Sequence, residues 1–108
     1  MAKYSMFVYT RPVPGKEKEF MDWYLNRHIP DMCRIPGVVG CHLYKVRDDQ
    51  FLLGAAHVEY PYVNNMEMET DDMNTLLMEM GKRRMSGENA WTDAIEEGPC
   101  YIMDPITG

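Results

Sequence analysis

Prolines and glycines divide this sequence into segments short enough to be single strands or helices. The main breaks are Pro12 with Pro14 and Gly15, Pro36-Gly37, and Gly98-Pro99. Residues 3–10, before the first break, are rich in aromatic and β-branched side chains and predict a strand that ends in a turn. Residues 99–104, after the last break, predict another strand. We therefore expect the first and the last structural segments of the chain to be strands of one sheet.

The segments between these breaks contain apolar residues at helical spacing. Residues 16–28 carry aromatic side chains behind a charged first turn and predict a helix. Pro30 disfavours helical geometry at the residue before it, so we expect the helix to kink or restart there, as a short piece over residues 31–34. A second helix is expected over residues 69–84, and a short one over residues 88–97.

Residues 38–46 and 51–60 predict two strands joined by a polar turn at residues 47–50. Because side chains alternate along a strand, this hairpin would have one polar and one apolar face. The polar face would hold His42, Tyr44, His57 and Glu59. The apolar face would hold Val39, Cys41, Leu43, Leu52, Ala56 and Val58.

The order of these segments is two strand–helix–strand units in series. It predicts the α+β class, with a ferredoxin-like β-α-β-β-α-β order and a four-stranded antiparallel sheet in a single domain, residues 1–108. Both helices would cover the same face of the sheet and leave the other face bare. A second copy of the same sheet is the simplest cover for such a face, so we expect a homodimer.

Charge and cysteine content argue against several kinds of partner. The net charge is -6, and the one basic cluster, Lys82-Arg83-Arg84, is too short to follow a phosphate backbone. We therefore expect no nucleic-acid partner and no membrane partner. Cys33, Cys41 and Cys100 are widely spaced, which favours free thiols in a reducing compartment. The N-terminal residues lead into the first strand without an apolar leader, so we expect a cytoplasmic protein.

The first half of the chain resembles a known family. The similar segments are Trp23-Tyr24-Leu25-Asn26-Arg27-His28-Ile29-Pro30, Ile35-Pro36-Gly37-Val38-Val39 and His42-Leu43-Tyr44-Lys45-Val46. They resemble the EthD-like branch of the dimeric α+β barrel superfamily, best over residues 3–46, and this resemblance implies two sheets paired as a barrel. Relatives include muconolactone and methylmuconolactone isomerases, polyketide cyclases, and cofactor-free or haem-degrading monooxygenases, so the fold alone does not select a reaction.

His28 and Tyr44 are the candidate catalytic residues. The resemblance implies a functional His28, because methylmuconolactone methylisomerases close the first helix with a histidine, and Tyr44 is similar to their strand-two tyrosine. From the residues themselves, a helix C-terminus would raise the pKa of His28, and Asp31 would orient one ring nitrogen and leave the other for substrate. The alternative is a histidine that only caps the helix.

The candidate substrate-binding residues are Trp23, Tyr24, Asp31, His42 and His57. His42, His57 and Glu59 are also a conceivable metal site, but two strands fix no ligand spacing for it. The methionines of the second helix could bind copper, but ordinary core packing explains them better. We expect no metal and no cofactor.

The function expected from the sequence is a small cofactor-free enzyme that uses general acid–base catalysis on an aromatic, lactone or polyketide-like molecule. Isomerisation, cyclisation or a lyase step would fit. Two alternatives remain open. One is a non-catalytic ligand-binding or accessory protein of an oxidative degradation system, and the other is a cofactor-free or haem-type monooxygenase.

Overall fold

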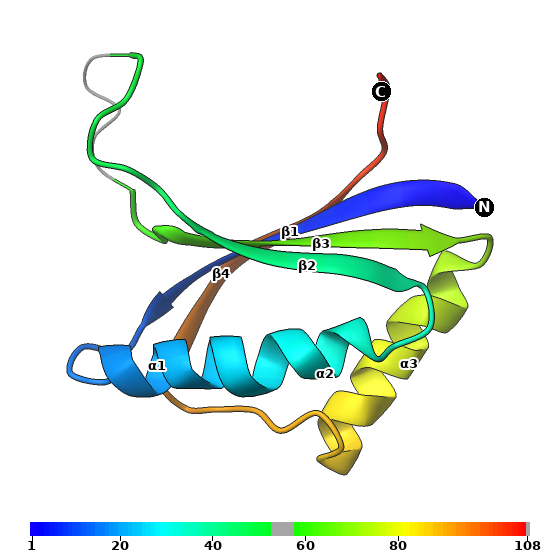
Figure 1. Ribbon diagram of the computed structural model, residues 1–108, viewed down its shortest axis with the longest axis horizontal. Helices are drawn as coiled ribbons and strands as arrows, with labels where there is room; N and C mark the ends of the chain where they lie inside the picture. The colour runs from blue at the N-terminus through cyan, green and yellow to red at the C-terminus, as the bar shows by residue number, and fades with distance from the viewer. Residues whose placement is uncertain (53–57, 108) are drawn as a thin grey trace.

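The computed structural model of this protein describes residues 1–52 and 58–107. In chain order the elements are β1 (Ala2–Pro12), α1 (Glu17–Trp23), η1 (Tyr24–His28), α2 (Ile29–Cys33), β2 (Val38–Lys45), β3 (Tyr62–Thr70), α3 (Met73–Ser86) and β4 (Ile95–Met103). The strands form one antiparallel four-stranded sheet in the order β2-β3-β1-β4, with the helices all on one face (Figure 1). The predicted ferredoxin-like α+β fold is therefore confirmed.

The strand that pairs with β2 is not the one predicted from the sequence. β3 begins at Tyr62, so Tyr44 lies opposite Val63 and His42 opposite Asn65. A long connection joins the two strands and closes where the Val46 N–H donates to the Pro61 carbonyl, 2.8 Å away. The predicted tight hairpin between residues 38–46 and 51–60 is therefore wrong.

The hairpin prediction failed because β3 is stabilised by burial of alternate side chains and not by a strong intrinsic preference of its residues for strands. Asparagine and glutamate are poor strand formers, and they hid an alternating pattern in residues 62–70. In the structure Asn64, Met66 and Met68 are buried on the helix-facing side, while Glu67 on the other side is exposed.

The apolar face predicted for residues 38–46 is correct for Cys41 and Leu43 but not for Val39. Cys41 is buried, and Leu43 packs against the core. The register between β2 and β3 shifts between Val38 and Gly40, which turns Val39 outward and leaves it 57% exposed. The predicted positions of Ala56 and His57 lie outside the described residues.

The helix-facing side of the sheet carries a dry core rich in methionine. Its main cluster consists of Met6, Met32, Ile35, Val38, Cys41, Met66, Met68 and Leu76. Burying a side chain of this size contributes about 1.5–3 kcal/mol, so this cluster fixes the helices against the sheet.

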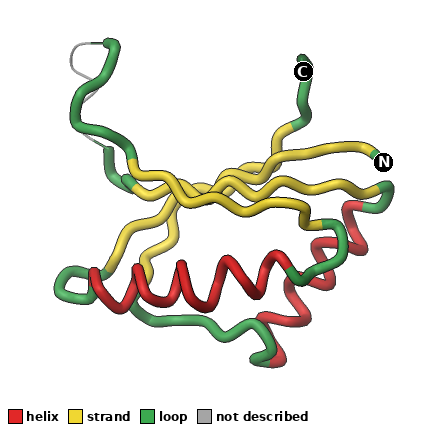
Figure 2. Tube along the Cα trace, in the orientation of Figure 1, coloured by secondary structure: helices red, strands yellow, loops and turns green. Residues whose placement is uncertain are grey.

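α1, η1 and α2 form one continuous helical rod beneath the sheet (Figure 2). The Ile29 N–H donates to the Tyr24 carbonyl, five residues back, so η1 is a π turn. Pro30 explains it, because proline lacks an N–H and its ring would clash with a carbonyl four residues back in an α-helix. The change in helical geometry expected at Pro30 is thus present as a π turn just before it. The helical rod continues through this turn without a break.

The second half of the chain departs from prediction at two boundaries. α3 begins at Met73, because the Asp72 side chain caps it by accepting from the Thr75 N–H at 3.1 Å. It ends at Ser86, and the next residue, Gly87, caps it with a φ of 83°, in the left-handed region. The short helix predicted over residues 88–97 is wrong: the chain leaves Gly87 as a loop and enters β4 at Ile95.

The face of the sheet opposite the helices has no covering element among the described residues. Residues on it include Phe7, Tyr9, His42, Tyr44, Val63 and Tyr101. Tyr44 and Tyr101 are 56% and 53% exposed. Residues 104–107 and residues 46–52 extend to this side of the sheet, away from the helices (Figure 1). In the described part of the chain, no helix is both long and apolar enough to span a membrane.

Candidate functional site

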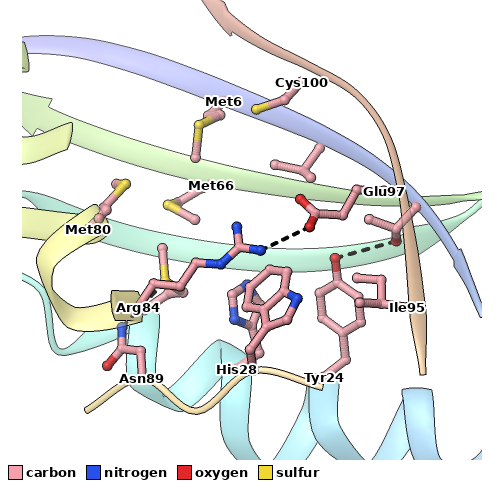
Figure 3. Close-up of a pocket in the computed structure, with 15 residues that line it drawn as sticks. Met6, Tyr24, His28, Met66, Met80, Arg84, Asn89, Ile95, Glu97 and Cys100 are labelled. Carbon is pink, nitrogen blue, oxygen red and sulfur yellow. Dashed lines mark hydrogen bonds and ion pairs between the residues drawn. The ribbon is translucent and has the colours of Figure 1, made fainter. Parts of the chain in front are cut away.

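A cavity of about 230 Å³ lies between the sheet and the helices (Figure 3). Its walls include four methionines, each from a different element: Met6 from β1, Met32 from α2, Met66 from β3 and Met80 from α3. Thioether side chains are polarisable and adaptable, so this wall suits a planar apolar molecule. The volume is below the roughly 300–1,000 Å³ of drug-sized pockets, which favours a small ligand.

The π turn places two polar aromatic side chains, Tyr24 and His28, at this cavity. Their ring centroids are 5.3 Å apart, edge to face. The His28 ring also stacks on Trp23 at 4.4 Å, with an interplanar angle of 18°, and meets the edge of Trp91 at 5.5 Å. His28 is only 8% exposed, so its ring is held in an aromatic cage at the cavity wall.

Burial lowers the pKa of His28 to about 4. The positive charge of Arg84 lowers the pKa further, and the negative charge of Asp31 opposes both effects. The expectation of a raised pKa is therefore wrong, because the helical rod does not end at His28 and its ring is desolvated. His28 is neutral at physiological pH, with one ring nitrogen able to accept a proton.

Asp31 does not hold the His28 ring, as the sequence had suggested it would. Its carboxylate accepts from Arg27 Nε at 2.9 Å and from Arg34 Nη1 at 2.7 Å. The side chain of Asp31 is 8% exposed, whereas those of both arginines are more than half exposed. Asp31 therefore clamps η1 to the end of α2 and acts on His28 only through its charge.

Two pairs of buried polar groups lie deeper in the core, Tyr24 with Thr10 and Cys41 with Asn64. The Tyr24 hydroxyl and Thr10 Oγ1 are 3.4 Å apart, and burial raises the pKa of Tyr24 to about 12. Cys41 Sγ donates to Asn64 Oδ1 at 3.2 Å, while Asn64 Nδ2 has no partner among the described residues. Sequence reasoning missed Thr10 and Asn64. Polar residues at inward positions of central strands were the signal that could have found them.

Arg84 and Glu97 lie where the cavity opens to solvent. Arg84 Nη2 and Glu97 Oε1 are 3.1 Å apart, and the Arg84 guanidinium lies 3.7 Å from the centroid of the Trp91 ring. Neither charged residue was predicted as part of a site. Arg84 was counted only with its basic neighbours, and Glu97 was assigned to a helix instead of to β4.

The structure brings together three of the residues predicted from the sequence, Trp23, Tyr24 and His28, and separates them from His42 and Tyr44. Tyr44 and His42 lie on the opposite face of the sheet, with ring centroids 6.4 Å apart. His28 and Tyr44 therefore do not share one site within this chain. His57 lies outside the described residues.

Metal-binding side chains do not cluster in the part of the chain that the structure describes. No group of three or more histidine, cysteine, aspartate or glutamate side chains there has the geometry to hold a metal ion. Among the described residues that line the cavity, the possible donors are four thioethers, one imidazole, one thiol, one carboxylate, two hydroxyls and one amide, from Met6, Met32, Met66, Met80, His28, Cys100, Glu97, Thr10, Tyr24 and Asn89.

Comparison with known proteins identifies relatives in fold. No protein-family model matches the sequence, and no curated protein is detectably similar to it. The structure is similar to that of a putative monooxygenase from Shewanella loihica PV-4, with a TM-score of 0.59, 18% identity, and coverage of 99% of this chain and 97% of that one.

A second similar structure is an EthD family protein from Bacillus halodurans C-125. The TM-score is 0.62 at 16% identity, and the match covers 98% of this chain and all of that one. Both matches extend over essentially the whole of each chain, so the likeness is that of the complete domain. At these identities it establishes the fold that these proteins have in common, a ferredoxin-like α+β domain.

Proposed function

We propose that this protein is a small enzyme that binds a compact aromatic, lactone or polyketide-like molecule in the cavity and transfers a proton with His28. The observation that carries the proposal is a neutral imidazole caged by Trp23 and Trp91 at the wall of a mainly apolar cavity. Such a ring accepts a proton in a water-poor site, which is what general base catalysis requires.

His28 acts as the base and Tyr24 as a hydrogen-bond donor. A base of low pKa is effective only on an acidic proton, such as a phenolic O–H or a C–H beside a carbonyl. Tyr24 keeps its own proton because its pKa is about 12, so its hydroxyl is available to an oxygen on which negative charge develops. Negative charge on the substrate also raises the pKa of His28 as the proton is transferred. Isomerisation, cyclisation and lyase steps all begin this way, and none of them needs a cofactor.

Oxygenation is a second candidate, supported by the same neutral base and by the name of the Shewanella protein. Removal of a phenolic proton leaves an electron-rich phenolate in an apolar cavity, and such anions react with dioxygen. Oxygen uptake on addition of a bound phenol separates this reaction from isomerisation. The non-catalytic alternative, a ligand-binding accessory protein, predicts tight binding with no turnover of any kind.

The assembly that we propose is a homodimer formed through the uncovered face of the sheet, where Tyr44 and Tyr101 are exposed. His28 lies on the other side of the sheet, so each protomer has a cavity of its own.

The decisive test measures binding and proton transfer separately. A panel of phenols, lactones and β-dicarbonyl compounds is screened by quenching of tryptophan fluorescence, because Trp91 lines the cavity and Trp23 packs against it. Exchange for deuterium of the C–H proton beside the carbonyl of each bound lactone or β-dicarbonyl compound is then followed by NMR. His28→Asn is expected to retain binding and to lower the exchange rate by about 10²–10⁴-fold.

His42→Asn is the matched control, because His42 is an exposed histidine on the other face of the sheet. It is expected to leave both binding and exchange unchanged. If His28→Asn exchanges the proton as fast as the wild type, His28 is not the base and the proposed function is wrong.

A further inference from the structure

Arg84 extends from α3 across the opening of the cavity toward Glu97 on β4 (Figure 3). Its guanidinium stacks 3.7 Å from the centroid of Trp91, and its Nη2 lies 3.1 Å from Glu97 Oε1. The side chains of Arg84 and Glu97 are 48% and 43% exposed. The charged pair is therefore a boundary between the apolar cavity and solvent.

Most of the hydrogen-bonding capacity of Arg84 is unused by the protein. A guanidinium has five N–H donors in one plane, and stacking on an aromatic ring occupies its face without using those donors. Among the described residues, only Nη2 has a partner, Glu97. The neighbouring Arg83 also uses a single nitrogen, Nε, which is 2.8 Å from Glu79 and 3.2 Å from Glu88, but Arg83 does not line the cavity. Arg83 is a structural arginine, whereas Arg84 has donors to offer at the cavity.

The natural complement of such a guanidinium is a carboxylate. Two parallel N–H···O bonds match the spacing of the carboxylate oxygens, and Trp91 already fixes the plane of the guanidinium. The bond to Glu97 is a part-exposed ion pair, which contributes little to stability. A carboxylate that arrives on a ligand can therefore replace Glu97, whose side chain is free to turn toward water.

We propose that the ligand of this cavity is a small carboxylic acid, whose ring system lies among the methionines and whose carboxylate binds Arg84. Glu97 holds the guanidinium in place while the cavity is empty. This proposal rests on the proposed function, since it names the substrate class of the same cavity, and it makes Arg84 the residue that determines specificity.

The overall negative charge of the protein makes Arg84 the main candidate for attracting an acid to the cavity. A net charge of -6 disfavours an anion at long range. Arg84 is the one lysine or arginine among the described residues that line the cavity. Arg84 is therefore the residue expected to contribute most to a preference for an acid over its neutral analogue.

The experiment compares acids with neutral analogues of the same shape. The probes are benzoate with benzamide, and 2-naphthoate with 2-naphthamide, titrated by calorimetry against the full chain. Arg84→Gln is expected to weaken binding of the acids by roughly tenfold to hundredfold and to leave the amides unchanged. Glu97→Gln is expected to tighten binding of the acids by about threefold or more, because it removes the competing carboxylate. Lys82→Gln, which removes an exposed charge from the same helix outside the cavity, is expected to change neither.

The outcomes separate this proposal from the proposed function. If the amides bind at least as well as the acids, or if Arg84→Gln affects both equally, the carboxylate proposal is wrong and the cavity still binds neutral molecules. If no probe binds the wild type, both the carboxylate proposal and the binding role of the cavity fail. Glu97→Gln provides a test that does not depend on a loss of binding, so an unstable Arg84 variant does not obscure the result.

Discussion

The protonation of His28 is determined by its surroundings and makes the stability of the protein depend on pH. Its pKa is about 4 in the folded protein and about 6.5 in an unfolded chain, so the unfolded state binds the proton more readily. The contribution of neutral His28 is therefore complete above pH 6.5 and is lost as the pH falls toward 4. This loss amounts to about 3 kcal/mol. Urea unfolding of His28→Gln is expected to show a flatter decline over this window than the wild type, and an unchanged slope would contradict this account of His28.

Gly98 affects stability through packing, because the Tyr60 ring lies too close to leave room for a side chain at this position. A Cβ atom there would lie 2.6 Å from the Tyr60 ring, which itself lies under the Arg11 guanidinium at 4.7 Å. Gly98→Ala is expected to lower the free energy of unfolding by about 1–3 kcal/mol. Gly81→Ala is the control, because it lies in α3 with no atom within 4 Å of the added methyl. It is expected to raise stability by up to about 1 kcal/mol in the same urea titration, and a Gly98→Ala variant as stable as the wild type would contradict the packing argument.

At the scale of elements, the rod formed by α1, η1 and α2 depends on Asp31. Its two arginine bonds span the segment that contains Pro30. Asp31→Asn is expected to cost about 1.5–3 kcal/mol, as is usual for hydrogen bonds to a charged group. NMR titration is also expected to find the pKa of His28 lower than in the wild type, since Asp31 raises it. Asp22→Asn, which breaks only an exposed pair with Lys18, is expected to cost about 0.5 kcal/mol or less.

The elements also show what the sequence could and could not predict. Element order followed from the proline and glycine breaks, and the helix that carries Trp23, Tyr24 and His28 followed from helical spacing, whereas the choice of His28 came from the family resemblance. β3 was missed because its signal is alternating burial of Asn64, Met66 and Met68, which local strand preference does not contain. The pairing of Arg84 with Glu97 joins residues from different elements across the cavity, so no local pattern encodes it. His28 was predicted as a site residue and lines the cavity, but the direction of its pKa shift depends on tertiary burial and was predicted wrongly.

At the scale of the whole molecule, the uncovered face of the sheet predicts a dimer. Phe7, Tyr9, Tyr44 and Tyr101 make this face aromatic, and the segments that extend beyond the sheet do so on the same side (Figure 1). Light scattering at micromolar concentration is expected to give about twice the chain mass of 12.6 kDa. Tyr44→Glu and Tyr101→Glu are each expected to shift the protein toward monomer, because a charge buried against a second sheet is costly. Met85→Glu, at a 91% exposed position on α3, is expected to leave the dimer intact. A wild-type monomer, or a dimer that tolerates both tyrosine substitutions, would show that this face is not the interface.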